Sequence, residues 1–124
     1  MHLKRVVVTG IGALTPVGNN LDDYWKGLLG GVSGADLITL FDASKFKTKF
    51  ACELKGFDAL QHFDRKEARK LDRYTQIAVA ASDEAVKDSA IDKDTMNPDR
   101  IGVVFASGIG GLITFQEEVI SFAK

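Results

Sequence analysis

Several features that mark particular protein classes are scarce in this chain of 124 residues. Its one cysteine, Cys52, cannot form a disulfide within the chain, which agrees with a reducing compartment. A net charge of −1 excludes a generally basic nucleic-acid-binding protein. Apolar runs such as residues 77–81 are far too short to span a bilayer. We therefore expect a cytoplasmic globular protein with no membrane association.

The N-terminus has a charged start followed by an apolar stretch, as signal peptides do. Here Gly10, Gly12 and Pro16 interrupt the apolar stretch early, and no small-residue cleavage site follows cleanly. We expect a first strand that begins almost at once.

The pattern of apolar residues predicts three strands, each followed by helical sequence. The β-branched run at 4–9 indicates a buried strand, and residues 10–18 form a turn-rich loop. A helix then follows, capped by Asn19 or Asn20 and stopped by Gly30 and Gly31. Its apolar residues share one stripe; they are Leu21, Tyr24, Trp25, Leu28 and Leu29.

The later elements complete an alternating order. Residues 47–55 indicate a weak strand, 64–72 and 74–90 are helical, and 97–98 form a turn. Residues 101–106 are typical of a central strand buried on both faces, and a helix starts at 112 after a glycine turn. The order β-α-β-α-β-α predicts an α/β fold with a mostly parallel sheet, forming one domain or part of one.

The first glycine pair, Gly10 and Gly12, lies between a strand and a helix, as in dinucleotide-binding sites. The third glycine position holds Thr15, Pro16 follows, and the helix begins too far downstream to meet a pyrophosphate. We interpret this segment as a tight turn that needs glycine for backbone freedom. A nucleotide-dependent oxidoreductase is therefore a weak alternative.

The second glycine cluster, residues 107–111, also joins a strand to a helix. It lacks the Gly-Lys-Ser/Thr of a phosphate-binding loop. Ser107 is not a nucleophile elbow, because Phe105 occupies the first glycine position of that motif. Three glycines around Ile109 permit close approach of another chain or a ligand.

Cys52 is a poor candidate for a nucleophile. It lies in mid-strand, where no helix N-terminus would stabilise a thiolate. The only candidate bases, His2 and His62, have no recognisable context. We expect a buried and inert thiol, and we expect neither a metal site nor a dissociable cofactor.

Five cations fall within residues 64–74. If this stretch is one helix, they share an arc of about 140°; they are Arg65, Lys66, Arg69, Lys70 and Arg73. A solvated helix face is one interpretation. The other is a surface that docks an acidic partner by electrostatic steering.

Five segments together resemble the β-ketoacyl-acyl-carrier-protein synthases, most closely the type II condensing enzymes. They are residues 5–18 (RVVVTGIGALTPVG), 25–29 (WKGLL), 48–51 (TKFA), 65–72 (RKEARKLD) and 107–112 (SGIGGL). The resemblance runs along the whole chain in family order. It implies a thiolase-like fold of two layered α/β/α halves, with residues 1–124 as the N-terminal part of the synthase N-terminal domain, roughly the first third of the enzyme.

The resemblance also implies an activity and a partner. Such an enzyme is an acyltransferase of fatty acid biosynthesis and condenses malonyl-acyl carrier protein with acyl-acyl carrier protein. Its catalytic Cys-His-His triad would lie beyond Lys124, and Cys52 matches none of the three, so residues 1–124 alone would be inactive. The intact enzyme would be a cytoplasmic homodimer that needs no dissociable cofactor.

Individual positions carry further implications of the resemblance. Lys66, Arg69 and Lys70 match positions that dock acyl carrier protein. Ile109, beside Gly108, matches the gate at the end of the acyl pocket. Two departures are Ala90, where a glycine often closes the second helix, and Cys52, which replaces another small residue. A polyketide condensing enzyme, a chain-length factor and a non-catalytic carrier-protein interaction domain remain alternatives.

Overall fold

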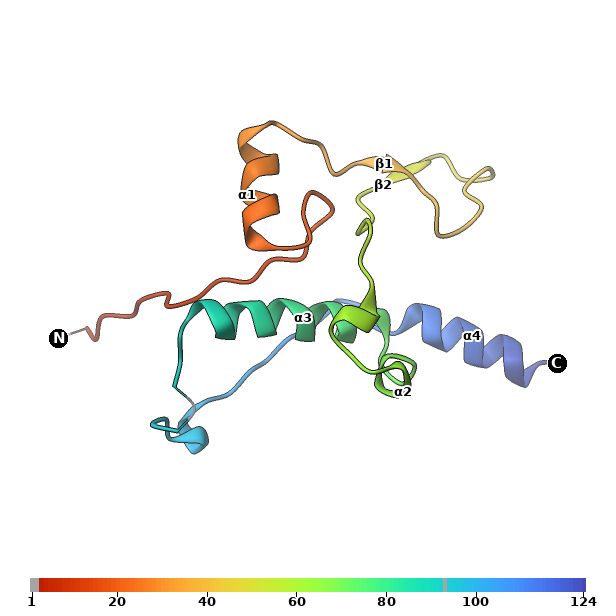
Figure 1. Ribbon diagram of the computed structural model, residues 1–124. Helices are drawn as coiled ribbons and strands as arrows, with labels where there is room; N and C mark the ends of the chain where they lie inside the picture. The colour runs from red at the N-terminus through yellow and green to blue at the C-terminus, as the bar shows by residue number, and fades with distance from the viewer. Residues whose placement is uncertain (1–2, 93) are drawn as a thin grey trace.

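The computed structural model describes residues 3–92 and 94–124, and one long helix crosses its centre (Figure 1). This helix is α3 (Arg73–Asp88). Helix α1 (Leu21–Leu29) and a two-stranded hairpin lie on one side of it in this view, while α4 (Leu112–Phe122) extends away at the C-terminus. The other elements are β1 (Asp36–Leu37), β2 (Phe50–Ala51), η1 (Ala59–Gln61), α2 (Arg65–Ala68) and η2 (Pro98–Arg100).

Short polar side chains fix where three of the helices begin. Asn20 caps α1 by accepting a hydrogen bond from the Asp23 N–H, which confirms the predicted start. Asp64 caps α2, and Asp72 caps α3. Because a second cap stands at Asp72, α2 ends at Ala68 and α3 starts as a separate helix. Residues 64–74 are therefore not one helix, and the shared arc of cations, which required one, does not form. The separate helical stretches expected at 64–72 and 74–90 correspond to α2 and α3.

The predicted helix over 74–90 is confirmed as α3, with an unusual ending. Ser89 still has helical angles, and Ala90 then adopts a φ of 50°. This left-handed conformation suits glycine, because a Cβ atom there approaches the following carbonyl oxygen. Ala90 thus occupies a backbone position where glycine would be unstrained.

The sheet is small and antiparallel. Asp36 pairs with Ala51, and Leu37 pairs with Phe50. The predicted strand over 47–55 contracts to two residues, and its partner lies in a stretch where the sequence pattern was weak. Among the described residues this is the one sheet, so the mostly parallel sheet is not formed here.

Two predicted strands, 4–9 and 101–106, are extended but unpaired in the described part of the chain. Val6 is 92% exposed and Val104 is 95% exposed, so the prediction of buried strands was wrong for this chain. Apolar composition alone does not bury a strand. It needs neighbours on both edges to accept its backbone hydrogen bonds and layers above and below.

The described residues form a very small core. Phe63, Ala78 and Ala80 are the buried apolar side chains. The accessible surface is 10607 Å², whereas a closed monomer of 13.5 kDa has about 6,500 Å². The apolar stripe of α1 is part of the excess, with Trp25 59% exposed. In residues 3–92 and 94–124 these apolar surfaces are left uncovered.

Candidate functional site

The first glycine pair packs directly on α3. A Cβ atom at Gly12 would overlap the backbone oxygen of Ala81, and one at Gly10 would overlap that of Ala85. Neither glycine has a positive φ. The expectation that the turn needs backbone freedom was therefore wrong. Glycine is needed because loop and helix approach so closely, and alanine on the helix permits it.

Carboxylates of the same helix, α3, also hold this loop. The Ala13 N–H donates to Glu84 Oε2 at 2.8 Å, and the Ile11 N–H donates to Asp88 Oδ2 at 2.9 Å. The other oxygen of Glu84 accepts from the Leu21 N–H, also at 2.8 Å. These are the backbone donors that a phosphate on this loop would require. Their occupation by carboxylates counts against a nucleotide site.

Glu84 therefore links two parts of the N-terminal segment. Leu21 is the first residue of α1, so the carboxylate stands at the positive end of that helix. Hydrogen bonds with a charged partner are shorter and stronger than neutral ones. The stretch from Ala13 to Leu21 is thus held at both ends by one side chain.

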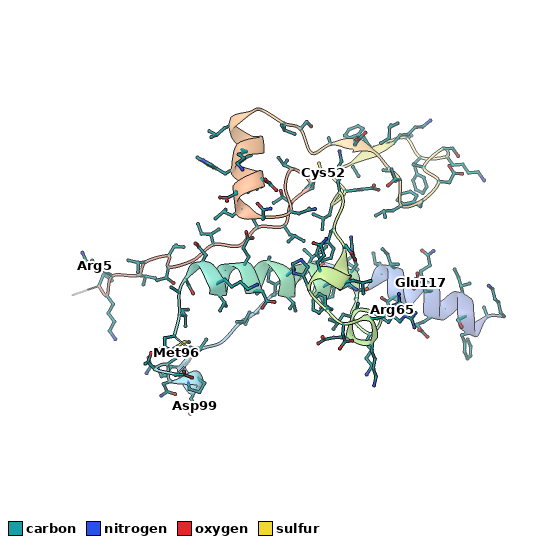
Figure 2. The ribbon with its side chains drawn as sticks, in the orientation of Figure 1. Arg5, Cys52, Arg65, Met96, Asp99 and Glu117 are labelled. Atoms are coloured by element: carbon teal, nitrogen blue, oxygen red, sulfur yellow. The ribbon has the colours of Figure 1, made fainter. Side chains whose placement is uncertain are left out.

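Cys52 lies just after β2 and is exposed, so the prediction of a buried thiol was wrong (Figure 2). Among the described residues no hydrogen bond joins it to a base. His62 instead stacks on Phe57 with ring centroids 5.5 Å apart. His2 lies outside the described residues. The surroundings of Cys52 give it no means of activation.

The basic cluster comprises Arg65, Lys66, Arg69 and Lys70. All four side chains are exposed around α2 and the break after it. In residues 3–92 and 94–124 the ion pairs are Lys26–Asp23 and Lys55–Asp36, so neither involves the cluster. Although the single helical face does not form, four uncompensated cations still gather within six residues of sequence.

The fifth cation, Arg73, is held elsewhere. Its guanidinium lies 4.5 Å from the centroid of the Phe57 ring and donates to the Phe57 carbonyl oxygen at 3.3 Å. Cation–π contact and hydrogen bond together fix the side chain against the segment before η1. Arg73 is therefore a packing residue, and we leave it out of the basic cluster.

A buried glutamine stabilises the break that presents the basic cluster. Gln76 Nε2 donates to the Ala68 oxygen at 2.7 Å and to the Leu71 oxygen at 3.2 Å. These carbonyls lie at the end of α2 and in the break, where regular helical bonding is interrupted. Gln76 is 9% exposed, so its amide is committed to this task. Because Ala68 and Leu71 flank Arg69 and Lys70, these hydrogen bonds also hold the backbone that carries the two cations.

The second glycine cluster forms the turn that enters α4. Ile109 is 73% exposed, and no atom lies within 4 Å of a Cβ placed at Gly108. Gly110 is tightly placed, since a Cβ there would lie 2.9 Å from Cε1 of Tyr74. Gly111 has a φ of 74°, which favours glycine. The three glycines thus differ: Gly108 faces open space, Gly110 permits close approach to Tyr74, and Gly111 makes a left-handed turn.

Asp72 connects this turn to the basic cluster. Its Oδ2 accepts a hydrogen bond from Thr114 Oγ1 at 2.6 Å, and its Oδ1 accepts from the Tyr74 N–H at 3.0 Å. The Thr114 hydroxyl first, and then the Tyr74 N–H, lower the pKa of Asp72 from its ordinary value. One carboxylate thereby caps α3 and anchors the first turn of α4.

The described residues contain neither a metal-binding cluster nor a membrane-spanning helix. No group of three His, Cys, Asp or Glu side chains is arranged to hold a metal ion in residues 3–92 and 94–124. No helix in the same residues has both the length and the apolar character needed to cross a membrane.

Comparison with known proteins decides the family. The sequence profile described as "Beta-ketoacyl synthase, N-terminal domain" matches residues 3–123. The chain belongs to the β-ketoacyl synthase family. This confirms the resemblance carried by the five segments.

Individual synthases are similar over nearly the whole chain. A 3-oxoacyl-[acyl-carrier-protein] synthase 2 of Synechocystis sp. is 50% identical over 118 residues, which is 95% of this chain and 28% of that protein. The Staphylococcus aureus protein of the same name is 50% identical over 113 residues, covering 91% of this chain and 27% of its own length. The chain thus spans just over a quarter of these synthases.

A solved ketosynthase has a similar fold. The structure titled "The ishigamide ketosynthase/chain length factor" superposes with a TM-score of 0.61 at 35% identity, over 71% of this chain and 22% of that one. The chain therefore has part of a ketosynthase-like, thiolase-type fold.

Sequence reasoning missed the residues that hold these sites together. Glu84 and Asp88 are acidic residues of an amphipathic helix, which usually face solvent. Gln76 is similarly inconspicuous. One signal was available for Asp72, since an Asp directly before a helical pattern indicates an N-cap and hence a helix boundary.

Proposed function

We propose that the chain is the N-terminal part of a 3-oxoacyl-[acyl-carrier-protein] synthase of the type II kind. The observation that carries the proposal is the 50% identity to two proteins of that name over more than nine-tenths of the chain. The enzyme is an acyltransferase that lengthens fatty acyl chains, acts as a cytoplasmic homodimer and uses no dissociable cofactor.

In the proposed reaction a cysteine thiolate attacks the thioester carbonyl of acyl-acyl carrier protein and displaces the carrier thiol. Malonyl carrier protein then loses carbon dioxide. The resulting carbanion attacks the acyl-cysteine carbonyl, a carbon–carbon bond forms, and the cysteine thiolate leaves. We assign none of these steps to residues of this chain, because Cys52 is exposed without a base.

The chain contributes recognition instead. We propose that Lys66, Arg69 and Lys70 dock the acidic carrier protein, since these side chains are exposed and without ion pairs in the described structure. We further propose that Ile109, beside Gly108, limits the acyl chain that the enzyme accepts. The open space at Gly108 supports this, because Ile109 has room to move.

The docking proposal is tested by reversing the three charges together in the longer protein that contains this chain. Exposed pairs contribute about 0.2–1 kcal/mol each, so the triple variant is the decisive one. We expect a higher KM for carrier protein and a weaker dependence on salt. Unchanged carrier-protein kinetics at low salt would refute the docking role.

The gate is tested with Ile109→Phe and Ile109→Ala in the same protein. We expect Phe to restrict the enzyme to short acyl primers and Ala to relax the limit. The measurement is the ratio of kcat/KM for short and long primers. An unchanged ratio in a folded Phe variant would show that the limit lies elsewhere.

Residues 1–124 alone should form no acyl-enzyme. The measurement is the intact mass after incubation with acyl-acyl carrier protein. A mass increase located at Cys52 would show that this residue forms an acyl-enzyme, and it would overturn the proposal that the nucleophile lies outside this chain.

The mostly parallel sheet belongs to the same proposal. Residues 4–9 and 101–106 would become paired, buried strands once the rest of the synthase supplies their neighbours. Slow amide exchange in both segments of the longer protein would support this, and fast exchange there would refute it.

One observation favours a second candidate. The similar solved structure is titled as a ketosynthase/chain length factor, and a polyketide subunit of that kind is the second candidate. A catalytic cysteine in the longer protein, detected by acylation, separates the synthase from a chain-length factor.

A further inference from the structure

A hollow of about 290 Å³ lies between the basic cluster and α4. Arg69 and Lys70 line one side of it, and Glu117 and Glu118 line the other. Figure 2 labels Glu117 on α4 and Arg65 on α2, the two elements that flank the hollow. The groove therefore has a basic wall, Arg69 and Lys70, and an acidic wall, Glu117 and Glu118.

The two walls are joined at the floor of the hollow. Asp72 and Thr114 both line it, and their hydrogen bond measures 2.6 Å. The neighbouring Gly110 packs against Tyr74 at the start of α3. Because these contacts come from the first turn of α4 and the break before α3, the acidic wall is fixed relative to the basic wall.

The walls do not neutralise one another. In residues 3–92 and 94–124 no ion pair within 4.0 Å joins Glu117 or Glu118 to any cation. Both glutamates and both cations are exposed. An anionic group that enters the groove is attracted by one wall and repelled by the other, over distances comparable to the Debye length of about 10 Å at 0.1 M salt.

We propose that Glu117 and Glu118 select among anionic partners of the basic cluster. A protein whose acidic residues lie on one face of a folded surface can reach Arg69 and Lys70 while keeping its charges away from the acidic wall. A uniformly acidic flexible chain cannot do so, because it fills the groove and meets both walls. The inference rests on the proposed carrier-protein docking and adds specificity to it.

The test compares two probes on the chain: acyl carrier protein, and a polyglutamate peptide of similar net charge. In Glu117→Gln with Glu118→Gln we expect binding of polyglutamate to tighten about tenfold and binding of carrier protein by about threefold or less, at low salt. The control pair, Asp94→Asn with Asp99→Asn, changes the net charge equally within six residues of sequence, and Figure 2 shows Asp99 far from Arg65 of α2. It should change both affinities by less than about twofold.

The outcomes separate the two proposals. If the wild-type chain binds carrier protein and charge reversal at Lys66, Arg69 and Lys70 abolishes that binding, docking at the basic cluster is supported. This conclusion does not depend on the result for the Glu117 and Glu118 variants. Equal tightening for both probes, or an equal effect of the control pair, would overturn selection by the acidic wall. Carrier-protein binding that survives the charge reversal would overturn docking at the basic cluster.

Discussion

The two glycine clusters have similar compositions and opposite surroundings. Gly10 and Gly12 lie against the backbone of α3, and carboxylates of that helix accept from the Ile11 and Ala13 N–H groups. Gly108 faces open space, and Ile109 beside it is 73% exposed. The first cluster is packed against a helix at both glycines, whereas the second is open at Gly108 and closely packed only at Gly110. A glycine-rich motif acquires its meaning from the element against which it lies.

Adding one methyl group to each cluster should expose this difference most strongly. Gly12→Ala places a Cβ against the backbone oxygen of Ala81, which cannot rotate away. We expect a loss of about 3 kcal/mol in the free energy of unfolding, at the upper end for overpacking. Urea titration of the helical circular dichroism signal measures it.

Gly108→Ala is the matched control, because nothing lies within 4 Å of its new Cβ. Its free energy of unfolding should stay within about 0.5 kcal/mol of wild type. Equal losses in the two variants would mean that the close approach of the first loop to α3 does not exist in solution.

Removing the carboxylate that holds the first loop should have the next largest effect. Glu84→Ala deletes the acceptor of the Ala13 and Leu21 N–H groups. We expect a loss of about 2 kcal/mol, since bonds to a charged group contribute about 1.5–3 kcal/mol and this one is partly exposed. The amides of both residues should exchange faster.

Glu117→Ala serves as control, because this glutamate of α4 is exposed. It should leave the exchange of Ala13 and Leu21 unchanged. Protection of those two amides that persists without Glu84 would refute its role as their acceptor.

The contrast also shows which parts of the molecule the sequence could predict. Helices α1, α3 and α4 were predicted because caps, apolar spacing and glycine stops are local signals. The strands at 4–9 and 101–106 were not observed in the described residues, because strand pairing depends on segments distant in the sequence, which a local apolar pattern does not identify. Likewise, the family and the basic cluster were readable, whereas Glu84 and Gln76 were not. Their roles depend on which segment they meet across the fold.

A smaller effect is expected where the second cluster is anchored. The pKa of Asp72 is lowered in the folded chain, chiefly by the Thr114 hydroxyl. The stability that ionised Asp72 contributes to the folded chain is therefore present above the unfolded pKa of about 3.9. This contribution is lost as the pH falls through the lower pKa of the folded state.

Asp72→Asn keeps a capping side chain but cannot titrate. In urea titrations from pH 6 to pH 2, the difference in stability between wild type and this variant should shrink as the pH falls below about 4. Thr114→Val should weaken the same pH dependence, because it removes the main cause of the shift. A difference that stays constant with pH would show that Asp72 is not perturbed.

The smallest expected effect is a gain. Ala90 has a φ of 50° after α3. Such a position costs an alanine about 1–2 kcal/mol, while glycine loses about 0.5–1 kcal/mol more backbone entropy on folding. Ala90→Gly should therefore stabilise the chain by about 0.5 kcal/mol, measured as a higher Tm. Ser89→Gly is the control and should destabilise, because Ser89 has helical angles.

The bidentate contact of Glu84 has a consequence for the order of folding. Its partners, Ala13 and Leu21, precede it by 71 and 63 residues. A ribosome adding about 5–20 residues per second needs roughly 4–14 s to extend the chain from Ala13 to Glu84. Until α3 has emerged, the first loop has no surface to pack on and no acceptor for its N–H groups. The segment that is synthesised first must therefore wait for a helix made much later.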